Sequence, residues 1–348
     1  MAWSVVKLTI TANTSNGVAD RLYANGNMQV PIDVAITAID GAGKPYYLSD
    51  QELAAIQLVD YNNVDRQLSG KWKYTDQENE FAHIIDGVGR SVSISTDAPG
   101  ASADASDHLG FQTKRYWVST TGIENQKIAA AITEPNGNYY TTHSKVEDNF
   151  AILRGVSPII YNTENVRINR DYNDTTTGSY DLSSEREVLG GRKTITEKLG
   201  WKAQNYHLSM DRGSVRKAEI YGYYTSSSAL NYSIKYQPVG RGLIIFYMWP
   251  LGSQRDMQTG VLLTTTHAPI FRVEALATVP TNNRRGSLCF TRVHYAGSEA
   301  FPIPWDDESH RYEQAGCKIY DEWGNWAQFK IIFTRSGKDQ DVAIIDTN

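Results

Sequence analysis

Residues 28–40, MQVPIDVAITAID, alternate apolar and polar side chains and are bounded by the turn sequences YANGN and DGAGKP. A period of two places Val30, Ile32, Val34 and Ile36 on one face of an extended strand. A half-buried strand of this kind needs antiparallel neighbours and a second layer against its apolar face. This run therefore favours a sheet-based fold whose strands serve as scaffold.

The neighbouring segments continue the same pattern. SVVKLTITAN (4–13) predicts a strand with Val6, Leu8 and Ile10 facing inward. In LSDQEL, Ser49 and Glu52 have the spacing of a capping box, which predicts one short helical turn.

The composition supports β-structure and a globular chain. The 348 residues include 21 Tyr and 8 Trp but only 5 Met, and aromatic side chains favour strands. With 41% hydrophobic residues the chain has material for two or three cores. A net charge of -5 does not favour nucleic acid as a partner.

We expect an all-β protein with two or three β-sandwich domains in tandem, the first immunoglobulin-like, and few short helices. The polar, Pro- and Gly-containing segment 96–110 is the best linker candidate. KIAAAITEPNGNYYTT (127–142) repeats the plan of VAITAIDGAGKPYYL (34–48), with another turn glycine at Gly324. The predicted domains are an immunoglobulin-like sandwich over 1–97, a second sandwich-like domain over 98–190 and an aromatic-rich β domain over 191–348.

The stretch LYANGNMQVPIDVAITAIDGAGKPY (22–46) resembles bacterial immunoglobulin-like modules of the invasin and intimin type. In those modules a short Gly turn precedes an alternating strand that ends in an acidic, Gly-containing hairpin. The resemblance covers the N-terminal ~100 residues and a partial second copy around TEPNGN. It implies a β-sandwich fold and a bacterial source.

The segment 163–217 is polar, and we expect a loop-rich junction with helix starts at Ser184 and Thr194. RKAEIYGYYTSSSALNYSIKYQ (216–237) predicts a Tyr-rich hairpin, and GLIIFYMW (242–249) predicts a buried strand. The two cysteines, Cys289 and Cys317, are interpreted as buried free thiols, with a cross-sandwich disulfide as the alternative.

Motifs for catalysis, phosphate binding and metal binding do not occur in the sequence. It contains no Gly-x-Ser-x-Gly, no His-Glu-x-x-His and no Walker loop, and its seven histidines form no local pair. We therefore expect no cofactor, no metal and no enzymatic activity.

Two acidic stretches near tryptophans are the first candidate binding loops. WDDESH contains Trp305 and Asp306, and YDEWGNW contains Asp321, Trp323 and Trp326. Aromatic rings stack on the apolar faces of sugars while carboxylates accept hydrogen bonds from hydroxyl groups. Solvated loop acids beside core aromatics, glycoside hydrolysis and calcium binding are the alternatives.

Tyrosines of the predicted hairpin form the second candidate set, namely Tyr221, Tyr223, Tyr224 and Tyr232. They suit an exposed recognition surface, a membrane-spanning hairpin of a pore-forming toxin, or simply half-buried rings of a sandwich.

The sequence thus predicts a non-catalytic binding protein, bacterial or phage-associated, that recognises a cell-surface glycan or protein. The main alternative is a β-pore-forming or insecticidal-type toxin, which would bind a membrane after oligomerisation. A self-assembling structural subunit and a glycoside hydrolase are further alternatives. The N-terminal sequence predicts a strand and not a cleavable signal peptide. We therefore expect the protein to be made in the bacterial cytoplasm and to act outside the cell after release.

Overall fold

The structure, a computed structural model, divides into two compact units: Met1–Ile159 with Trp323–Asn325, and Ile160–Glu322 with Trp326–Asn348. It describes residues 3–14, 16–85, 111–144, 148–225, 229–252, 255–264, 270–299, 310–311, 314–334 and 340–347. Nearly all regular structure in these residues is β, as the composition predicts, and the sheets form tandem sandwiches.

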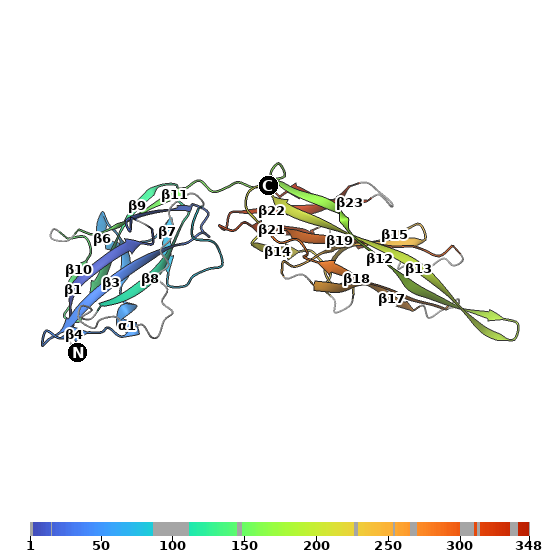
Figure 1. Ribbon diagram of the computed structural model, residues 1–348, viewed down its shortest axis with the longest axis horizontal. Helices are drawn as coiled ribbons and strands as arrows, with labels where there is room; N and C mark the ends of the chain where they lie inside the picture. The colour runs from blue at the N-terminus through green and yellow to red at the C-terminus, as the bar shows by residue number, and fades with distance from the viewer. Residues whose placement is uncertain are drawn as a thin grey trace. The chain divides into compact units, whose positions relative to one another are not determined.

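The first unit contains two sheets packed face to face (Figure 1). The first sheet has the order β1 (Trp3–Ala12), β3 (Val30–Asp40), β8 (Phe111–Thr120), β7 (Trp72–Thr75), with β4 (Pro45–Tyr46) beside β3. The second has the order β2 (Ala19–Tyr23), β11 (Ala151–Val156), β9 (Asn125–Thr133), β5 (Gln57–Asp60), β6 (Asn63–Gln67), with β10 (Tyr139–Thr141) beside β9.

This strand order is that of an immunoglobulin sandwich. The strands β1, β3, β8 and β7 take the places of A, B, E and D, and β11, β9, β5 and β6 take those of G, F, C and C′. The chain changes sheets between β1 and β2, and β2 then pairs in parallel with β11. The immunoglobulin-like prediction for the first domain is confirmed.

The predicted inward face of β3 is buried, because Val30, Ile32, Val34 and Ile36 are all buried. The expectation of a half-buried strand is wrong at its start, where Pro31 and Asp33 on the other face are buried as well. The prediction for β1 is wrong at Val6, which is 52% exposed. A register shift between Val5 and Lys7 interrupts the ladder with β3, and such a bulge changes the face on which the following side chains lie. Leu8 and Ile10 return to the core.

The structure does not divide where the sequence analysis placed its domain boundaries. Strand β8, beyond the predicted linker, pairs with both β3 and β7, so residues on either side of 96–110 belong to one sheet. The linker itself lies outside the described residues. The predicted second domain 98–190 is therefore shared between the two units, whose division lies at Ile159.

Among the described residues the one helix is α1 (Asp50–Leu53), with the predicted capping box. The Ser49 N–H donates to the Glu52 carboxylate over 2.7 Å, and the Glu52 N–H donates back to Ser49 Oγ. No helix in the described ranges is long and apolar enough to cross a membrane.

The second unit contains an eight-stranded and a four-stranded sheet. The eight-stranded sheet has the order β17 (Arg255–Thr264), β18 (Ile270–Thr281), β12 (Val166–Val188), β13 (Gly191–Met210), β19 (Leu288–Tyr295), β16 (Gly242–Met248), β15 (Ser233–Val239), β20 (His310–Arg311). The four-stranded sheet has the order β14 (Lys217–Tyr221), β21 (Gly316–Tyr320), β22 (Trp326–Thr334), β23 (Asp341–Asp346).

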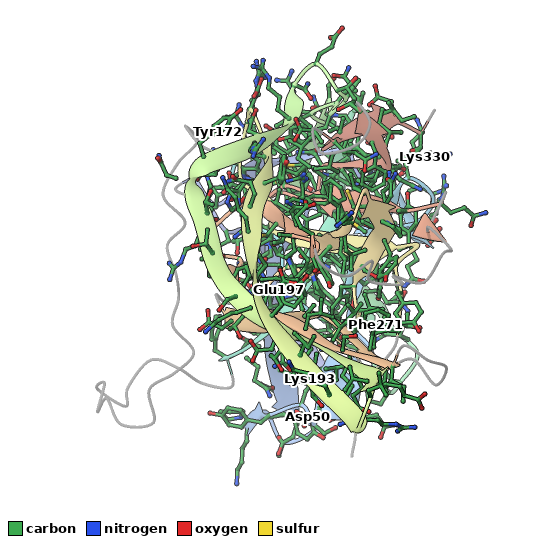
Figure 2. The ribbon with its side chains drawn as sticks, turned by 90° about the vertical axis from the view of Figure 1, so that its right-hand side faces the viewer. Asp50, Tyr172, Lys193, Glu197, Phe271 and Lys330 are labelled. Atoms are coloured by element: carbon green, nitrogen blue, oxygen red, sulfur yellow. The ribbon has the colours of Figure 1, made fainter. Side chains whose placement is uncertain are left out.

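The predicted loop-rich junction with helices is wrong, because this segment forms the long hairpin β12–β13. Its turn is Leu189–Gly190, and the side chains of Tyr180, Leu182 and Ser184 are buried at strand spacing. The expected helix starts relied on local capping patterns alone. The segment has no apolar residues at helical spacing, and its buried residues follow the two-residue period of a strand. The hairpin projects past β17 and β18 in Figure 1, and Glu197 and Lys193 lie along it in Figure 2.

The predicted Tyr-rich hairpin is also wrong. Strand β14 pairs with β21 in the four-stranded sheet, whereas β15 pairs with β16 and β20 in the eight-stranded sheet. The next segment agrees with its prediction, since every residue of β16 is buried.

Candidate functional site

The outward face of the four-stranded sheet gathers aromatic and cationic side chains. Strand β22 alternates from Trp326 to Ile331: Ala327, Phe329 and Ile331 are buried, while Trp326, Gln328 and Lys330 are exposed. Cross-strand neighbours bring the matching residues of β14 and β21 onto the same face. We call this surface the sheet face; it comprises Lys217, Glu219, Tyr221, Lys318, Tyr320, Trp326, Gln328 and Lys330, of which Tyr320 is covered by its neighbours and only 7% exposed.

Trp326 is the most exposed aromatic residue of the sheet face, with 46% of its surface accessible. The ammonium group of Lys318 lies 4.1 Å from its ring centroid, a distance at which the cation is attracted to the ring. Because Trp326 stands on a paired strand opposite Tyr320, its backbone is held rigidly. The ring is therefore both accessible and positioned in advance.

Tyr320 and Tyr221 are fixed by polar contacts beside it. The Tyr320 hydroxyl donates to Glu219 Oε1 over 3.0 Å, and the Lys217 ammonium lies 5.5 Å from the Tyr320 ring. Gln328 Nε2 donates to the Tyr221 hydroxyl over 3.0 Å. These contacts leave few rotamers to be lost when a ligand binds.

The charge of the sheet face is opposite in sign to that of the whole chain. Three lysines, Lys217, Lys318 and Lys330, stand against one glutamate, Glu219, whereas the chain carries -5. Lys330 also lies opposite Ile345, which is 41% exposed. The face thus offers an aromatic ring, hydrogen-bond donors and acceptors, and an excess of positive charge.

Two of the predicted site residues, Trp326 and Tyr221, lie on the sheet face, and two of their sequence neighbours do not. Trp323 is 9% exposed and belongs to the core of the first unit, where its indole N–H donates to the Ile84 carbonyl over 2.7 Å. Asp321 is 0% exposed and accepts a hydrogen bond from the Tyr161 hydroxyl. Both side chains have structural partners in place of a ligand.

The other predicted tyrosines form a separate cluster. The rings of Tyr223 and Tyr232 lie 5.1 Å apart, and Tyr232 also packs against the buried Trp249. Tyr224 is 39% exposed. The remaining predicted residues, Trp305 and Asp306, lie outside the described residues.

The sequence analysis missed the cations and the amide of the sheet face. The sequence does contain a pattern that predicts part of this face, because Trp326, Gln328 and Lys330 are spaced two residues apart in WAQFK. Period-two spacing places them on one side of a strand. The contribution of Lys318 and Lys217 depends on pairing between strands that are distant in sequence.

No protein-family model matches the chain, and no curated protein matches it. Among solved structures, the C-terminal domain of the Streptococcus agalactiae AgI/II polypeptide BspA is similar at 11% identity with a TM-score of 0.23, covering 98% of this chain and 100% of that one. A chain described as BspA_C_mut has 9% identity and a TM-score of 0.17, covering 98% of each chain. Scores this low do not establish a common fold, so the function of the sheet face is inferred from the residues of this chain alone.

Proposed function

We propose that this protein is a non-catalytic, bacterial or phage-associated binding protein that recognises a cell-surface glycan through the sheet face. The observation that carries the proposal is the exposed Trp326 ring held beside Lys318 on a rigid strand. An indole stacks on the apolar face of a sugar ring, and the neighbouring amide, carboxylate and ammonium groups suit its hydroxyl groups. A protein ligand that lacks sugar is the competing outcome of the test below.

The test is binding of the labelled full chain to a glycan array, with two variants. Trp326→Ala removes the stacking ring at an exposed position, so the fold is expected to persist. Tyr172→Ala is the matched control, because Tyr172 is 77% exposed and has the Arg170 guanidinium 5.0 Å from its ring. Tyr172 and Lys330 lie on opposite sides in Figure 2, so the control leaves the sheet face intact.

The proposal predicts array signals that disappear with Trp326→Ala and persist with Tyr172→Ala. If the natural chain gives no glycan signal but binds deglycosylated cell-surface protein, the ligand is a protein and not a glycan. Equal signals for the natural chain and Trp326→Ala would remove the sheet face from the proposal.

A second candidate function, β-pore formation, is favoured by the hairpin β17–β18 and no longer by the tyrosines. Its strands contain 10 and 12 residues, close to the ~10 that cross a bilayer in a barrel. In β18 one face is apolar and buried, formed by Phe271, Val273, Ala275, Ala277 and Val279. Among the described residues, five residue pairs join β18 to β12.

A reversible crosslink tests this candidate. Ser183 and Arg272 are opposite residues of β12 and β18, and opposite residues lie within disulfide reach. The variant Ser183→Cys/Arg272→Cys should leak dye from liposomes only after reduction if the hairpin must leave the sheet. Leakage that is equal before and after reduction would exclude this hairpin, and no leakage from the natural chain would exclude pore formation.

A further inference from the structure

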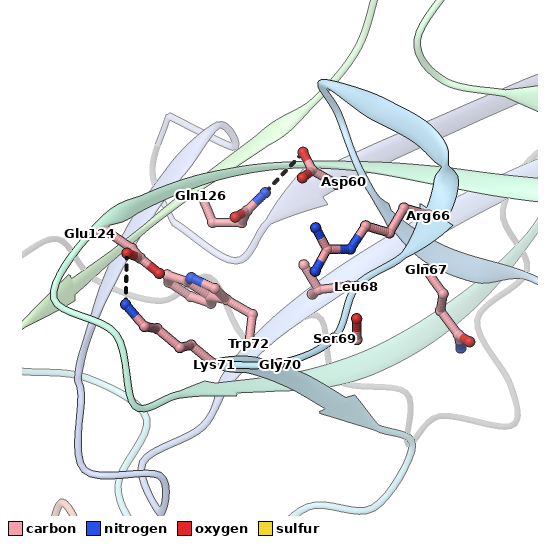
Figure 3. Close-up of a pocket in the computed structure, with 10 residues that line it drawn as sticks. All are labelled: Asp60, Arg66, Gln67, Leu68, Ser69, Gly70, Lys71, Trp72, Glu124 and Gln126. Carbon is pink, nitrogen blue, oxygen red and sulfur yellow. Dashed lines mark hydrogen bonds and ion pairs between the residues drawn. The ribbon is translucent and has the colours of Figure 1, made fainter.

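The first unit contains a cavity of about 360 Å³ at the edge where β6 leads into β7 (Figure 3). Its lining comes from strands of both sheets and from the β6–β7 turn. The volume lies within the usual range for small-molecule sites. Its lining includes Asp60, Arg66, Leu68, Trp72, Glu124 and Gln126.

Trp72 provides an unmatched hydrogen-bond donor in this lining. The residue is 3% exposed, and its indole nitrogen is buried without an acceptor among the described residues. A buried donor left unsatisfied costs free energy, so such groups are rare in folded proteins. Figure 3 shows the indole among the residues that line the cavity.

Arg66 provides a second donor group. In the part of the chain that the structure describes, no carboxylate forms an ion pair with its guanidinium. Figure 3 shows the guanidinium directed inward between Asp60 and Leu68. The other cation of the lining, Lys71, already pairs with Glu124 over 3.4 Å.

Acceptors and an apolar floor complete the lining. Asp60 Oδ1 accepts from Gln126 Nε2 over 3.2 Å, which places a carboxylate and an amide on the wall opposite Trp72. Leu68 is 6% exposed and supplies apolar surface. The formal charges of Arg66 and Lys71 balance those of Asp60 and Glu124, so the cavity as a whole favours neither a dianion nor a dication.

We propose that this cavity binds a sugar carrying a single carboxylate, such as a uronic acid. The ligand carboxylate accepts from the Arg66 guanidinium, which is exposed and forms no ion pair among the described residues, and from the Trp72 indole N–H, which lacks an acceptor there. The sugar hydroxyl groups donate to the carboxylates of Asp60 and Glu124. A neutral sugar leaves both donors poorly matched, and a phosphate brings two negative charges beside two carboxylates.

The probes for the test are methyl glucuronide and its uncharged counterpart methyl glucoside, each titrated into the full chain. The readout is the set of tryptophan indole N–H resonances in a nitrogen–proton NMR spectrum. The resonance of Trp72 is identified by its absence in Trp72→Phe, which keeps the apolar ring. Arg66→Gln removes the charge at an exposed position, and Arg167→Gln is the matched control in the second unit.

We expect methyl glucuronide to shift the Trp72 resonance and methyl glucoside to shift it little. Arg66→Gln should weaken glucuronide binding by about tenfold or more, since hydrogen bonds to charged groups contribute at this level, while Arg167→Gln leaves it unchanged. Equal effects of the two probes, an unmoved Trp72 resonance, or unaltered binding in Arg66→Gln would overturn the proposal. Trp72 and Arg66 belong to the first unit and Trp326 to the second, so the Trp72 resonance and the Arg66→Gln variant test the cavity separately from the sheet face.

Discussion

The ammonium group of Lys318 lies 4.1 Å from the ring centroid of Trp326, and the two residues stand on the adjacent strands β21 and β22. The same ammonium lies 5.0 Å from the Tyr320 ring. One cation therefore contacts two aromatic rings of the sheet face.

Replacing Lys318 by Met tests the role of this charge, because the aliphatic part of the side chain is retained. We expect glycan binding to weaken by about two- to tenfold, with a change in unfolding free energy within about 1 kcal/mol. Affinity and urea unfolding of Lys318→Met are compared with those of Lys73→Met, an exposed lysine of the first unit. Identical affinities of the two variants would show that the charge does not position Trp326.

The thiols of Cys289 and Cys317 should be unreactive in the native protein. Both are buried free cysteines, and burial raises the pKa of each thiol to about 12. Because the thiolate is the reactive form, little of it exists at pH 8. A thiol-labelling reagent should modify neither cysteine in the folded protein and both cysteines in denaturant without reductant. Failure to label them in denaturant would indicate a disulfide.

Asp20 should make the stability of the first unit depend on pH. Burial raises the pKa of this carboxyl from 3.8 to about 6, against the opposing effect of the Arg21 backbone N–H. The folded state then binds the proton more tightly than the unfolded state, so this contribution to stability falls as pH rises from about 4 to about 6 and is constant above that.

The variant Asp20→Asn isolates this contribution. Its stability relative to the natural chain should increase between about pH 4 and 6 and then level off, as measured by urea unfolding. A difference that is constant over this range would contradict the assignment.

Gly260 should tolerate no side chain. Its φ is +123°, and a Cβ atom built there lies 1.9 Å from the Ala275 carbonyl oxygen. Gly43 also has a positive φ of +75°, but its Cβ atom would meet nothing within 4 Å. We expect Gly260→Ala to cost more than about 3 kcal/mol of unfolding free energy and Gly43→Ala about 1 kcal/mol. Similar losses would show that backbone strain, and not the clash, sets the cost.

The fold class was predictable from the sequence because strand burial repeats every two residues. Strand β18 shows this directly, and the predicted face of β3, from Val30 to Ile36, is buried at the same spacing. The run Gly242–Met248 was predictable on a different ground, because an uninterrupted apolar run of strand length is buried on both faces. A bulge has no comparable signal, so the exposure of Val6 followed only from the register shift beside it.

Errors arose where local patterns competed with pairing between distant strands. Ser184 and Glu187 have the spacing of a helix start, yet β12 pairs with β13 and β18. Tyr221 and Tyr232 are close in sequence but lie beside different sheets, because β14 pairs with a strand almost one hundred residues away. Local propensity is a weak prior when tertiary packing decides the outcome.

The candidate site was predictable only in part for the same reason. Trp326 stands out in the sequence as an aromatic residue near acids, but its acidic neighbour Asp321 is buried. The groups that accompany Trp326, among them Lys318 and Lys217, reach the face through β21 and β14. Their proximity is a consequence of sheet register.

The central claim is that the Trp326 ring contacts the glycan. The most direct measurement is the affinity of the strongest array ligand for the natural chain, Trp326→Ala and Tyr172→Ala, each shown to be folded by its unfolding curve. We predict that Trp326→Ala weakens binding by about tenfold or more while Tyr172→Ala stays within about twofold of the natural chain. Equal affinities for all three proteins would contradict the claim.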